Sequence, residues 1–371
     1  MIPPLPLALL DDVPRILPGV MGDELPAWLA ARQFPAMRTK QVRRWVLQAR
    51  ATAFEQMSDI PLSLRTELSR EFSVFTTSVE KHQISTDHTH KLVLKLADGK
   101  FIECVLIQDD GRATACISTQ VGCAMGCVFC ASGLNGVARN LTSAEILEQL
   151  VRLRNLTIPD AEKTATDGDL ATRLTHIVVM GMGEPLANLD NLLAALSVAG
   201  DEQGLGIGAR HVTISTVGLP AKIRALSKIK KQYHLAVSLH APNDELRTQI
   251  VPTNAKTGIA EIMAAADDYF AETGRQVTYE YVVLGRQNDQ PEHARQLVGL
   301  LRGRKAHVNL IPWNEVDGLP FKRPRPEDLT QFIDTVRKAG ISVKVRKRKG
   351  AEIDAACGQL RRKVEQAAAA P

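Results

Sequence analysis

The stretch that decides the fold is Gln120–Gly133, "QVGCAMGCVFCASG", which places Cys123, Cys127 and Cys130 at the spacing C-x3-C-x2-C. The whole chain has six cysteines in 371 residues, and no histidine accompanies these three in the stretch. A structural zinc site usually binds four ligands arranged as two pairs, so it would need a distant fourth ligand here. Three thiolates can instead bind three irons of a 4Fe–4S cluster and leave the fourth iron open to a small molecule. The spacing therefore favours a cluster with one open coordination site.

Outward from this stretch, short apolar strands alternate with helical segments from about Ala113 onward. The expected strands are Thr114–Thr119, His176–Met182, His211–Thr216, His234–His240, Val277–Leu284, His307–Trp313 and Ser342–Lys347. This alternation indicates a parallel sheet, as a barrel or as an open doubly wound sheet. In both arrangements, functional groups lie at the C-terminal ends of the strands.

Polar residues follow these strands one after another. The cysteines come after the first strand, "GMGEP" (Gly181–Pro185) after the second, and Ser215 ends the third. "SLH" (Ser238–His240) ends the fourth, and Asn314 lies just past the sixth. We expect these groups to meet at one mouth, where the glycines allow close approach of a ligand and Glu184 can bind an amino group.

Before the first of these strands the pattern differs. Residues up to about 75 are predicted to be helical, with Val42, Trp45 and Val46 at helical spacing. Apolar residues then alternate on both sides of Asp98 and Gly99, which predicts a β-hairpin. We therefore expect a helical domain over 1–75, a hairpin linker over 76–112, a core over 113–349 and a C-terminal segment over 350–371. The polar stretch Thr157–Thr175 is predicted to be an exposed insertion.

The composition, with 44% hydrophobic and 23% charged residues, is that of a globular protein. No apolar run is long enough to span a membrane. The N-terminal "MIPPLPLALLDD" contains prolines and no basic start, so we expect no secretory signal. A cytoplasmic, reducing compartment follows, where cysteines serve in metal binding or in chemistry.

Basic residues are clustered, and the net charge is +5. The clusters are "VKVRKRKG" (Val343–Gly350), "KIKK" (Lys228–Lys231), "FKRPRP" (Phe321–Pro326) and "MRTKQVRRW" (Met37–Trp45). Each alone could be a solvated helix end or loop. Four on one chain favour RNA or DNA as a partner.

Three cysteines lie outside the central stretch. Cys357 follows the basic run in a turn of small residues, and cationic neighbours lower the pKa of a thiol and make it a better nucleophile. Cys104 is expected to be a small buried hydrophobe. Cys116 lies seven residues before Cys123.

The cysteine spacing after a first core strand, with Phe129 before the last cysteine, is the pattern of the radical S-adenosylmethionine (SAM) superfamily. Several stretches closely resemble the bacterial dual-specificity RNA methyltransferases, which methylate C2 of adenine in 23S rRNA and tRNA. They are "CISTQVGCAMGCVFCASG", "GMGEPLANLDNL", "HVTISTVGLPAKIRAL", "LAVSLHAPNDELR", "VNLIPWN" and "IDAACGQL". The resemblance runs from about residue 25 to residue 362. It implies a partial (β/α)6 barrel with an N-terminal helical accessory domain and a connecting β-hairpin.

The resemblance also implies roles. Cys123, Cys127 and Cys130 would hold one 4Fe–4S cluster, and a SAM site would comprise Gly183, Glu184, Ser215, Ser238, Leu239, His240 and Asn314. Of two SAM molecules per turnover, one would methylate Cys357 and the other would be cleaved reductively to a radical. Glu103 would remove the C2 proton, and Cys116 would release the product through a transient disulfide with Cys357. The implied partners are RNA and an electron donor of the flavodoxin type, with a monomeric enzyme.

Two alternatives remain open. A relative that methylates C8 of adenine in 23S rRNA shares every catalytic cysteine. An RNA-binding module with a structural metal, which belongs to a different class, would bind zinc and leave Cys357 unmodified. On the residues alone, Glu103 would be an exposed strand glutamate.

Overall fold

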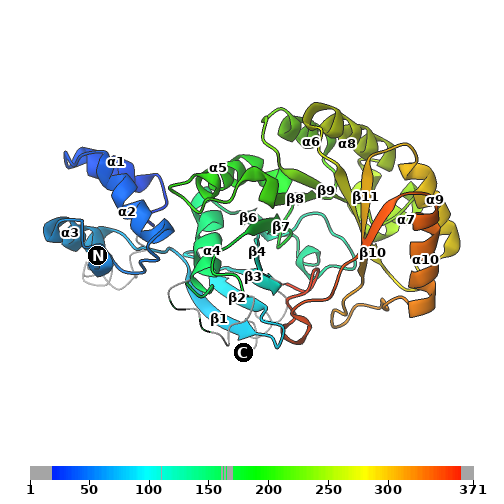
Figure 1. Ribbon diagram of the computed structural model, residues 1–371, viewed down its shortest axis with the longest axis horizontal. Helices are drawn as coiled ribbons and strands as arrows, with labels where there is room; N and C mark the ends of the chain where they lie inside the picture. The colour runs from blue at the N-terminus through cyan, green and yellow to red at the C-terminus, as the bar shows by residue number, and fades with distance from the viewer. Residues whose placement is uncertain (1–18, 110, 160–161, 163, 165–169, 361–371) are drawn as a thin grey trace, which may run out of the picture. The chain divides into compact units, whose positions relative to one another are not determined.

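A computed structural model describes residues 19–109, 111–159, 162, 164 and 170–360. The chain divides into two compact units, Met1–Thr77 and Ser78–Pro371 (Figure 1). None of the helices in the described ranges is both long and apolar enough to cross a membrane.

The first unit is helical, as predicted. Its elements are α1 (Glu24–Ala31), α2 (Met37–Leu47), the 3-10 helix η2 (Phe54–Gln56) and α3 (Leu62–Glu71). Its core includes Leu25, Leu29, Val42, Val46, Leu64 and Leu68, all of them buried. Their four-residue spacing on each helix places them on the face that packs inward. Trp45, which shares the predicted stripe with Val42 and Val46, is only half-buried, and its indole nitrogen donates to Asp59.

Ten strands form the main sheet of the second unit within the described residues, in the order β1-β2-β3-β4-β7-β8-β9-β10-β11-β12. They are β1 (Ser78–Ile84), β2 (His90–Lys95), β3 (Phe101–Asp109), β4 (Arg112–Cys116), β7 (His176–Val179), β8 (Val212–Thr216), β9 (His234–Ser238), β10 (Val277–Val283), β11 (Ala306–Pro312) and β12 (Ser342–Val345). A separate two-stranded sheet pairs β5 (Gln120–Gly122) with β6 (Val137–Asn140).

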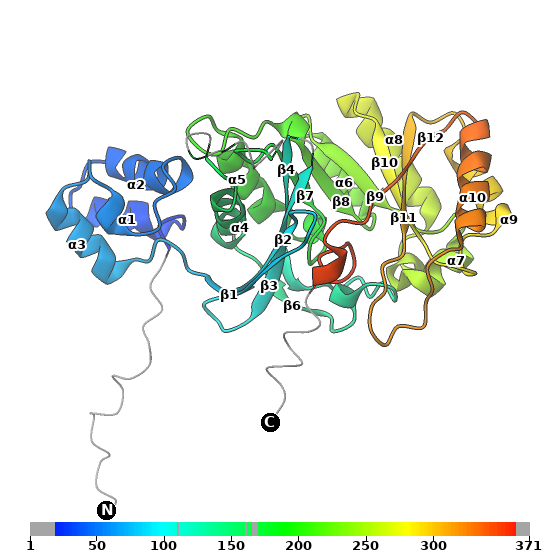
Figure 2. The same cartoon turned by 60° about the horizontal axis from the view of Figure 1, so that its bottom comes forward.

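From β4 to β12 every pairing is parallel and the strand order follows the chain. The helices between these strands are α4 (Ser143–Asn155), α5 (Leu189–Gly200), α6 (Pro220–Ser227), α7 (Asp244–Ile250), α8 (Ile259–Thr273), α9 (Pro291–Leu301) and α10 (Pro326–Lys338). They flank the parallel strands in both views (Figures 1 and 2). Sequential parallel strands with helical crossovers are the arrangement of an incomplete β/α barrel, which confirms the predicted fold class.

The short 3-10 helices of this unit lie in its loops. They are η3 (Ala131–Gly133), η6 (Pro185–Asn188), η7 (Ala209–His211), η8 (Pro252–Ala255) and η9 (Ala351–Ile353). Of these, η3 follows the last cysteine of the central stretch, and η9 comes just before Cys357.

The predicted hairpin is present as β2 and β3, which turn at Asp98 and Gly99. Gly99 has a φ of +78°, a conformation that a residue with a side chain adopts only at a cost. The hairpin is part of the main sheet, because β3 pairs with β4 on its other side, with Val105 opposite Cys116. The sheet is therefore continuous across residue 112, where the sequence placed the boundary between the hairpin and the core.

Several strands end earlier than their apolar pattern predicts. β7 ends at Val179 and β9 at Ser238, whereas the sequence suggested Met182 and His240. Beyond each end the backbone turns, with a φ of +104° at Gly183 and +61° at His240. These residues leave the sheet and line the space at its C-terminal edge.

The predicted insertion Thr157–Thr175 lies partly outside the described residues. Its two ends are anchored. The hydroxyl of Thr157 donates to the carbonyl of Thr172 at 3.0 Å, and the amide of Thr175 donates to the carbonyl of Ala113 at 2.8 Å.

Candidate active site

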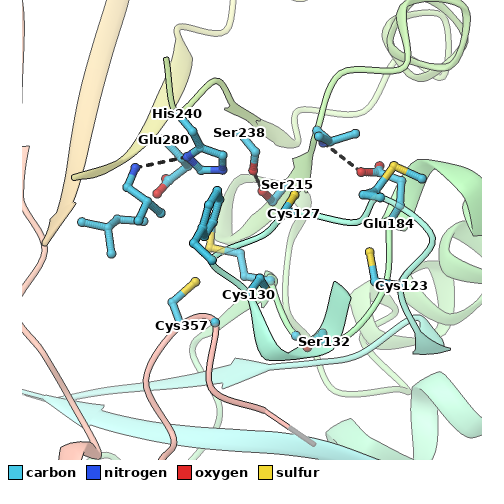
Figure 3. A pocket seen from close by; sticks show the side chains of 18 of the residues that line it. Cys123, Cys127, Cys130, Ser132, Glu184, Ser215, Ser238, His240, Glu280 and Cys357 are labelled. Carbon is cyan, nitrogen blue, oxygen red and sulfur yellow. Dashed lines mark hydrogen bonds between the residues drawn. The ribbon is translucent and has the colours of Figure 1, made fainter. Parts of the chain in front are cut away.

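One cavity lies at the C-terminal ends of the parallel strands and collects most of the predicted site residues (Figure 3). Those that line it are Cys123, Cys127, Cys130, Gly183, Glu184, Ser215, Ser238, His240, Asn314 and Cys357. Leu239, Glu103 and Cys116 are not among its lining residues. The expectation that the motifs at the C-terminal ends of the strands would meet at one mouth is therefore correct for these residues.

The cysteine loop is shaped by its backbone. Gly122 and Gly126 have φ values of +83° and +68°, so the chain reverses sharply on both sides of Cys123. The amide of Cys123 donates to the carbonyl of Gly136 at 2.9 Å. These turns direct the three cysteines toward the same cavity.

Phe129 anchors the loop on the barrel. Its ring is buried and meets the His240 ring edge-to-face at a centroid distance of 5.0 Å. Its carbonyl accepts a hydrogen bond from the indole of Trp313 at 3.1 Å. The aromatic residue before the last cysteine therefore fixes the loop against two strand ends.

The three thiols are unfavourable as bare anions. Burial raises the pKa of Cys123 to about 12 and raises the pKa of Cys130. The pKa of Cys127 is raised well above its ordinary value by burial and then by the charges of Cys130 and Cys123. A bound cation deprotonates such thiols and supplies the missing positive charge. The donor set therefore fits a group made of several irons.

The number of thiols bears on which group they could hold. Structural zinc usually takes four protein ligands on one atom, and the loop supplies three cysteines. In a 4Fe–4S cluster each cysteine binds a different iron, so three thiolates that line one cavity fit a cluster with one open iron.

Glu184 offers a buried negative charge on the side of Cys123 (Figure 3). Its two carboxylate oxygens accept hydrogen bonds from the amides of Leu186 at 3.0 Å and Val217 at 2.8 Å. Burial raises the pKa of Glu184, and these hydrogen bonds oppose the rise. No salt bridge among the described residues uses this carboxylate. It is suited to a ligand's ammonium group.

The loop after β9 is held from inside. The amide of Leu239 donates to the carbonyl of Glu280 at 3.0 Å. Its carbonyl accepts a hydrogen bond from the guanidinium of Arg247 at 2.9 Å. Leu239 is fully buried, so it supports its neighbours without reaching the cavity. The hydroxyl of Ser238 lies 3.3 Å from that of Ser215, on the adjacent strand.

His240 is a neutral side chain in this site. Its Nδ1 accepts a hydrogen bond from the amide of Val282 at 3.1 Å. Burial, and then the charge of Arg247, lower the pKa of His240 to about 3. The imidazole therefore stays uncharged at ordinary pH.

Asn314 connects the cavity to the loop that carries Cys357. Its Nδ2 donates to the carbonyl of Cys357 at 3.3 Å. Its Oδ1 is buried and accepts no hydrogen bond within the described part of the chain. A buried acceptor without a donor carries a free-energy cost, which a bound ligand with an N–H or O–H group would remove. This orphaned oxygen fits a site for a polar cofactor such as SAM.

Cys357 lies beside Cys130 in the close-up view (Figure 3). The amide of Ala131, next to Cys130, donates to the carbonyl of Gly358 at 2.8 Å. Burial raises the pKa of the Cys357 thiol, while the charge of Arg346 lowers it. The sequence-based expectation of a lowered pKa is therefore wrong in its net direction, because burial outweighs the one cation that reaches the sulfur.

Cys116 ends β4 and is not among the lining residues of this cavity. It is 7% exposed, and burial raises its pKa to about 12, with Arg346 lowering the pKa and Cys357 raising it. The charge of the same guanidinium, that of Arg346, therefore acts to lower the pKa of both Cys116 and Cys357. The six cysteines, all within the described residues, are free thiols.

Glu103 is buried, at 4% exposed, so the interpretation from residues alone as an exposed strand glutamate is wrong. It alternates with Cys104 on β3 and shares a sheet face with Val105, which lies opposite Cys116. Cys104 faces the other side, is fully buried, and has a pKa raised by burial, which confirms it as a small buried hydrophobe.

Sequence reasoning missed two charged residues that line the cavity, Glu280 and Arg346. Glu280 lies inside the apolar strand "VTYEYVV", where it accepts from Asn309 at 3.0 Å and 3.1 Å. A carboxylate within a buried strand was an available signal. Arg346 was counted only as one member of a basic cluster.

Comparisons with known proteins agree with this geometry. Residues 117–298 match the radical SAM superfamily, and residues 17–74 match the ribosomal RNA large subunit methyltransferase N-terminal domain. A crystal structure of a radical SAM methyltransferase from Sphaerobacter thermophilus superposes with a TM-score of 0.85 at 40% identity, covering 91% of this chain and 96% of that one.

Curated relatives extend the likeness over almost the whole chain. A probable dual-specificity RNA methyltransferase RlmN from Rhodopirellula baltica is 52% identical over 92% of this chain and 89% of its own length. Another, from Bacillus licheniformis, is 41% identical over 93% of this chain and 92% of its own. Such identity over such coverage, with the cysteine loop and strand-end residues in one cavity, shows that the chain belongs to the RlmN family of radical SAM RNA methyltransferases.

Proposed function

We propose that this enzyme methylates C2 of adenine in 23S rRNA and in tRNA, through a methyl group carried on Cys357. The observation that carries the proposal is the shared cavity, where Cys357 and the three clustered cysteines face the same space. Asn314 and Ala131 hold the Cys357 loop against that space. A methyl-carrying sulfur beside a radical-generating centre is what methylation of a non-nucleophilic carbon requires.

Cys123, Cys127 and Cys130 hold the cluster in this proposal, and when bound, the cluster and SAM supply the radical chemistry. Glu184 binds the ammonium group of SAM, and Asn314 Oδ1 accepts from a polar hydrogen of it. Gly183 leaves room for its backbone approach. Polar atoms along the cavity come from Ser215, Ser238 and His240. Leu239 positions Ser238 and His240, its neighbours in the chain.

Cys357 takes a methyl group from SAM, so that a bond from sulfur to carbon forms as the sulfonium bond breaks. The thiol must lose its proton first, and burial opposes that loss. Arg346 is the cation whose charge favours the Cys357 thiolate. It also favours the Cys116 thiolate.

Glu103 accepts the proton from C2 of the adenine. Cys116 then attacks the sulfur of Cys357. The carbon carried by Cys357 is by then bonded to C2 of the adenine. A disulfide forms as the bond between that carbon and the Cys357 sulfur breaks, the carbon takes up a proton to become the methyl group, and external reduction restores both thiols. Cys116 and Cys357 are both within the field of Arg346, which supports their pairing.

The proposal extends to partners and organisation. RNA is the substrate, an electron donor of the flavodoxin type reduces the cluster, and the enzyme acts as a monomer in the cytoplasm. The domains are a helical unit over 1–75 that helps to bind RNA, a hairpin over 76–112, a barrel over 113–349 and the cysteine-bearing segment over 350–371.

The decisive experiment is the mass of the Cys357 peptide, from protein expressed with iron and purified without oxygen. We expect an added methyl group that is absent from a Cys357→Ala variant. Mapping the methyl group on the RNA product then separates C2 from C8. An unmodified Cys357 in protein with a full cluster and added SAM would overturn the proposal. A methyl group at C8 would replace it by the alternative reaction.

A further inference from the structure

A second cavity adjoins the active-site cavity and is separate from the cysteine loop. Its lining residues are Ile107, Thr114, Val178, Ile311, Pro312, Asn314, Arg323, Arg346, Lys347, Arg348, Lys349, Ala355, Ala356 and Cys357. It shares Ile311, Asn314, Arg346 and Cys357 with the first cavity. We call it the basic cavity. The two spaces therefore meet at Cys357.

The charge of the basic cavity is one-sided. Five lining residues are cationic, and none of the described residues that line it is Asp or Glu. The acids that act on these cations lie outside the lining. Asp109 lies 2.9 Å from Lys349 Nζ and also interacts with Lys347, and Glu280 interacts with Arg346. Because the lining itself contains five cations and no acid, it favours the binding of an anion.

Two of these cations are held close together. Burial, and then the charge of Arg348, lower the pKa of Arg323, with Glu315 opposing. Arg323 is fixed by a hydrogen bond from its guanidinium to the carbonyl of Trp313 at 3.3 Å. Neither Arg348 nor Lys347 takes part in a salt bridge among the described residues, and both are exposed. An anion between these groups would relieve their mutual repulsion.

The backbone fixes where these cations lie. The amide of Arg346 donates to the carbonyl of Leu310 at 2.8 Å, so the basic run leaves the sheet at the C-terminal end of β12. The run ends at Gly350, with a φ of +62°, whose amide donates to the carboxylate of Asp87 at 3.0 Å. A Cβ at Gly350 would lie 2.7 Å from the Cβ of Ala355. This tight turn sends the chain directly into the Cys357 loop.

We propose that the basic cavity binds a phosphodiester group of the RNA, next to the nucleotide whose base enters the active-site cavity. Arg348, Lys347 and Arg323 contact the phosphate oxygens, and arginine in particular can bind them in pairs. This site rests on the proposed function, because it assumes that an RNA base must reach Cys357.

An RNA phosphate explains the placement better than a free anion does. The cavity opens beside Cys357, so a phosphate bound there leaves its own or its neighbour's base within reach of that sulfur. Base-modifying enzymes extrude the target nucleotide from its stack, and backbone contacts hold it in that state. Inorganic phosphate shares the chemistry and is an outcome of the test.

The first test compares two double variants with the same charge change. Lys347→Gln/Arg348→Gln removes two cations of the basic cavity. Lys228→Gln/Lys231→Gln removes two exposed lysines between α6 and β9, at the opposite ends of the strands. Binding of an unmodified tRNA transcript is measured by fluorescence anisotropy between about 50 and 200 mM salt.

We expect the basic-cavity variant to bind about 10-fold or more weakly, with a salt-dependence slope smaller by about 2. The control should stay close to wild type. Methylation of Cys357 by SAM needs no RNA, so it should proceed equally in all three proteins. Equal affinity and equal slope for the two double variants would overturn the proposal.

A second test locates the phosphate. Single neutral methylphosphonates are placed around the methylated adenine in a synthetic RNA hairpin. For one of them, we expect the loss of affinity in wild type to disappear in the basic-cavity variant. Additive losses at every position would contradict the site. A second result would also contradict the RNA site. If inorganic phosphate stabilised wild type but not the variant against unfolding, while the two proteins bound RNA equally, the cavity would be a free-anion site.

These outcomes are distinguishable from failure of the proposed function. If no adenine were methylated but the variant alone lost RNA affinity, the phosphate site would stand and the assigned reaction would fall. If methylation occurred with the same RNA affinity in both double variants, the reaction would stand and this site would fall.

Discussion

The ammonium nitrogen of Lys91 lies 3.6 Å from the carboxylate of Glu103, and both side chains are almost wholly buried, at 7% and 5% exposed. The same nitrogen donates to the carbonyl of Asp354 at 3.3 Å. Lys91 therefore joins the proposed base to the loop that carries Cys357. The strand register supports this arrangement. Val105 on β3 pairs with Lys91 of β2 on one side and with Cys116 of β4 on the other.

Lys91→Met should abolish RNA methylation while leaving methylation of Cys357 in place. The change removes the counter-charge of Glu103 and the tether to Asp354. Removing one partner of a buried ion pair costs on the order of 3–5 kcal/mol, so chemical denaturation should also show lower stability. Lys95→Met, on the same strand but exposed, is the matched control. The role assigned to Lys91 would fail if the two variants behaved alike.

Gly183→Ala should weaken SAM binding and destabilise the barrel. Gly183 has a φ of +104°, and a Cβ there would lie 2.7 Å from the Cβ of Gln120. Strain of this kind costs roughly 1–3 kcal/mol. Gly206→Ala is the control, because Gly206 also has a positive φ, +65°, but a Cβ there meets nothing within 4 Å. Calorimetric titration with SAM and denaturation should separate the two. Equal effects would mean that backbone angle alone, and not the close approach, matters.

Arg247→Met should unfold the loops after β8 and β9. Arg247 is 1% exposed and donates to the carbonyls of Leu239 at 2.9 Å and Val217 at 2.5 Å. Removing the guanidinium leaves the buried carbonyl of Val217 without its donor, at a cost of about 1–3 kcal/mol, whereas the carbonyl of Leu239 keeps the amide of Ala241 as a donor at 2.8 Å. Arg247→Lys should restore little, because an ammonium cannot reproduce the planar fork.

The stability of both Arg247 variants is measured by denaturant unfolding, and their SAM affinity by calorimetry. Arg224→Met is a suitable comparison, since Arg224 pairs with Asp268 at the surface. Exposed pairs contribute about 0–1 kcal/mol, so that variant should remain near wild type. If Arg247→Lys were as stable as wild type, only the positive charge would be needed at this position.

The histidine pair on the β1–β2 hairpin should make stability fall in acid. Nε2 of His82 lies 3.0 Å from Nδ1 of His90. Burial, and then the charges of His82 and His88, lower the pKa of His90 from 6.5 to about 4. The unfolded chain therefore binds more protons than the folded one between these values, so stability rises with pH across this window and is lost as pH falls from about 6.5 toward 4.

His90→Gln should flatten this loss in a series of thermal unfolding curves from pH 4 to pH 7. Lys81→Gln, an exposed neighbour on β1 that does not titrate there, should leave the profile unchanged. A His90→Gln profile as steep as that of wild type would remove the pair from the acid response.

The sequence by itself determined the fold class and the outline of the site. Sequential apolar strands separated by helices allow few topologies, and the side chains at their C-terminal ends must meet at one edge. For this reason the linear order of the motifs was enough to predict Glu184, Ser215 and Asn314 beside the cysteine loop. The cysteine spacing is local, so it predicted the proposed cluster ligands directly.

Only the tertiary structure decided what depends on burial and on pairing between distant segments. Glu103 looks like an exposed strand residue, yet it is buried and its carboxylate lies 3.6 Å from Lys91 of β2. The basic run suggested a low pKa for Cys357, yet desolvation raises it, and only Arg346 opposes the rise. Desolvation and charge proximity depend on which segments pack together, and a linear pattern does not contain that information.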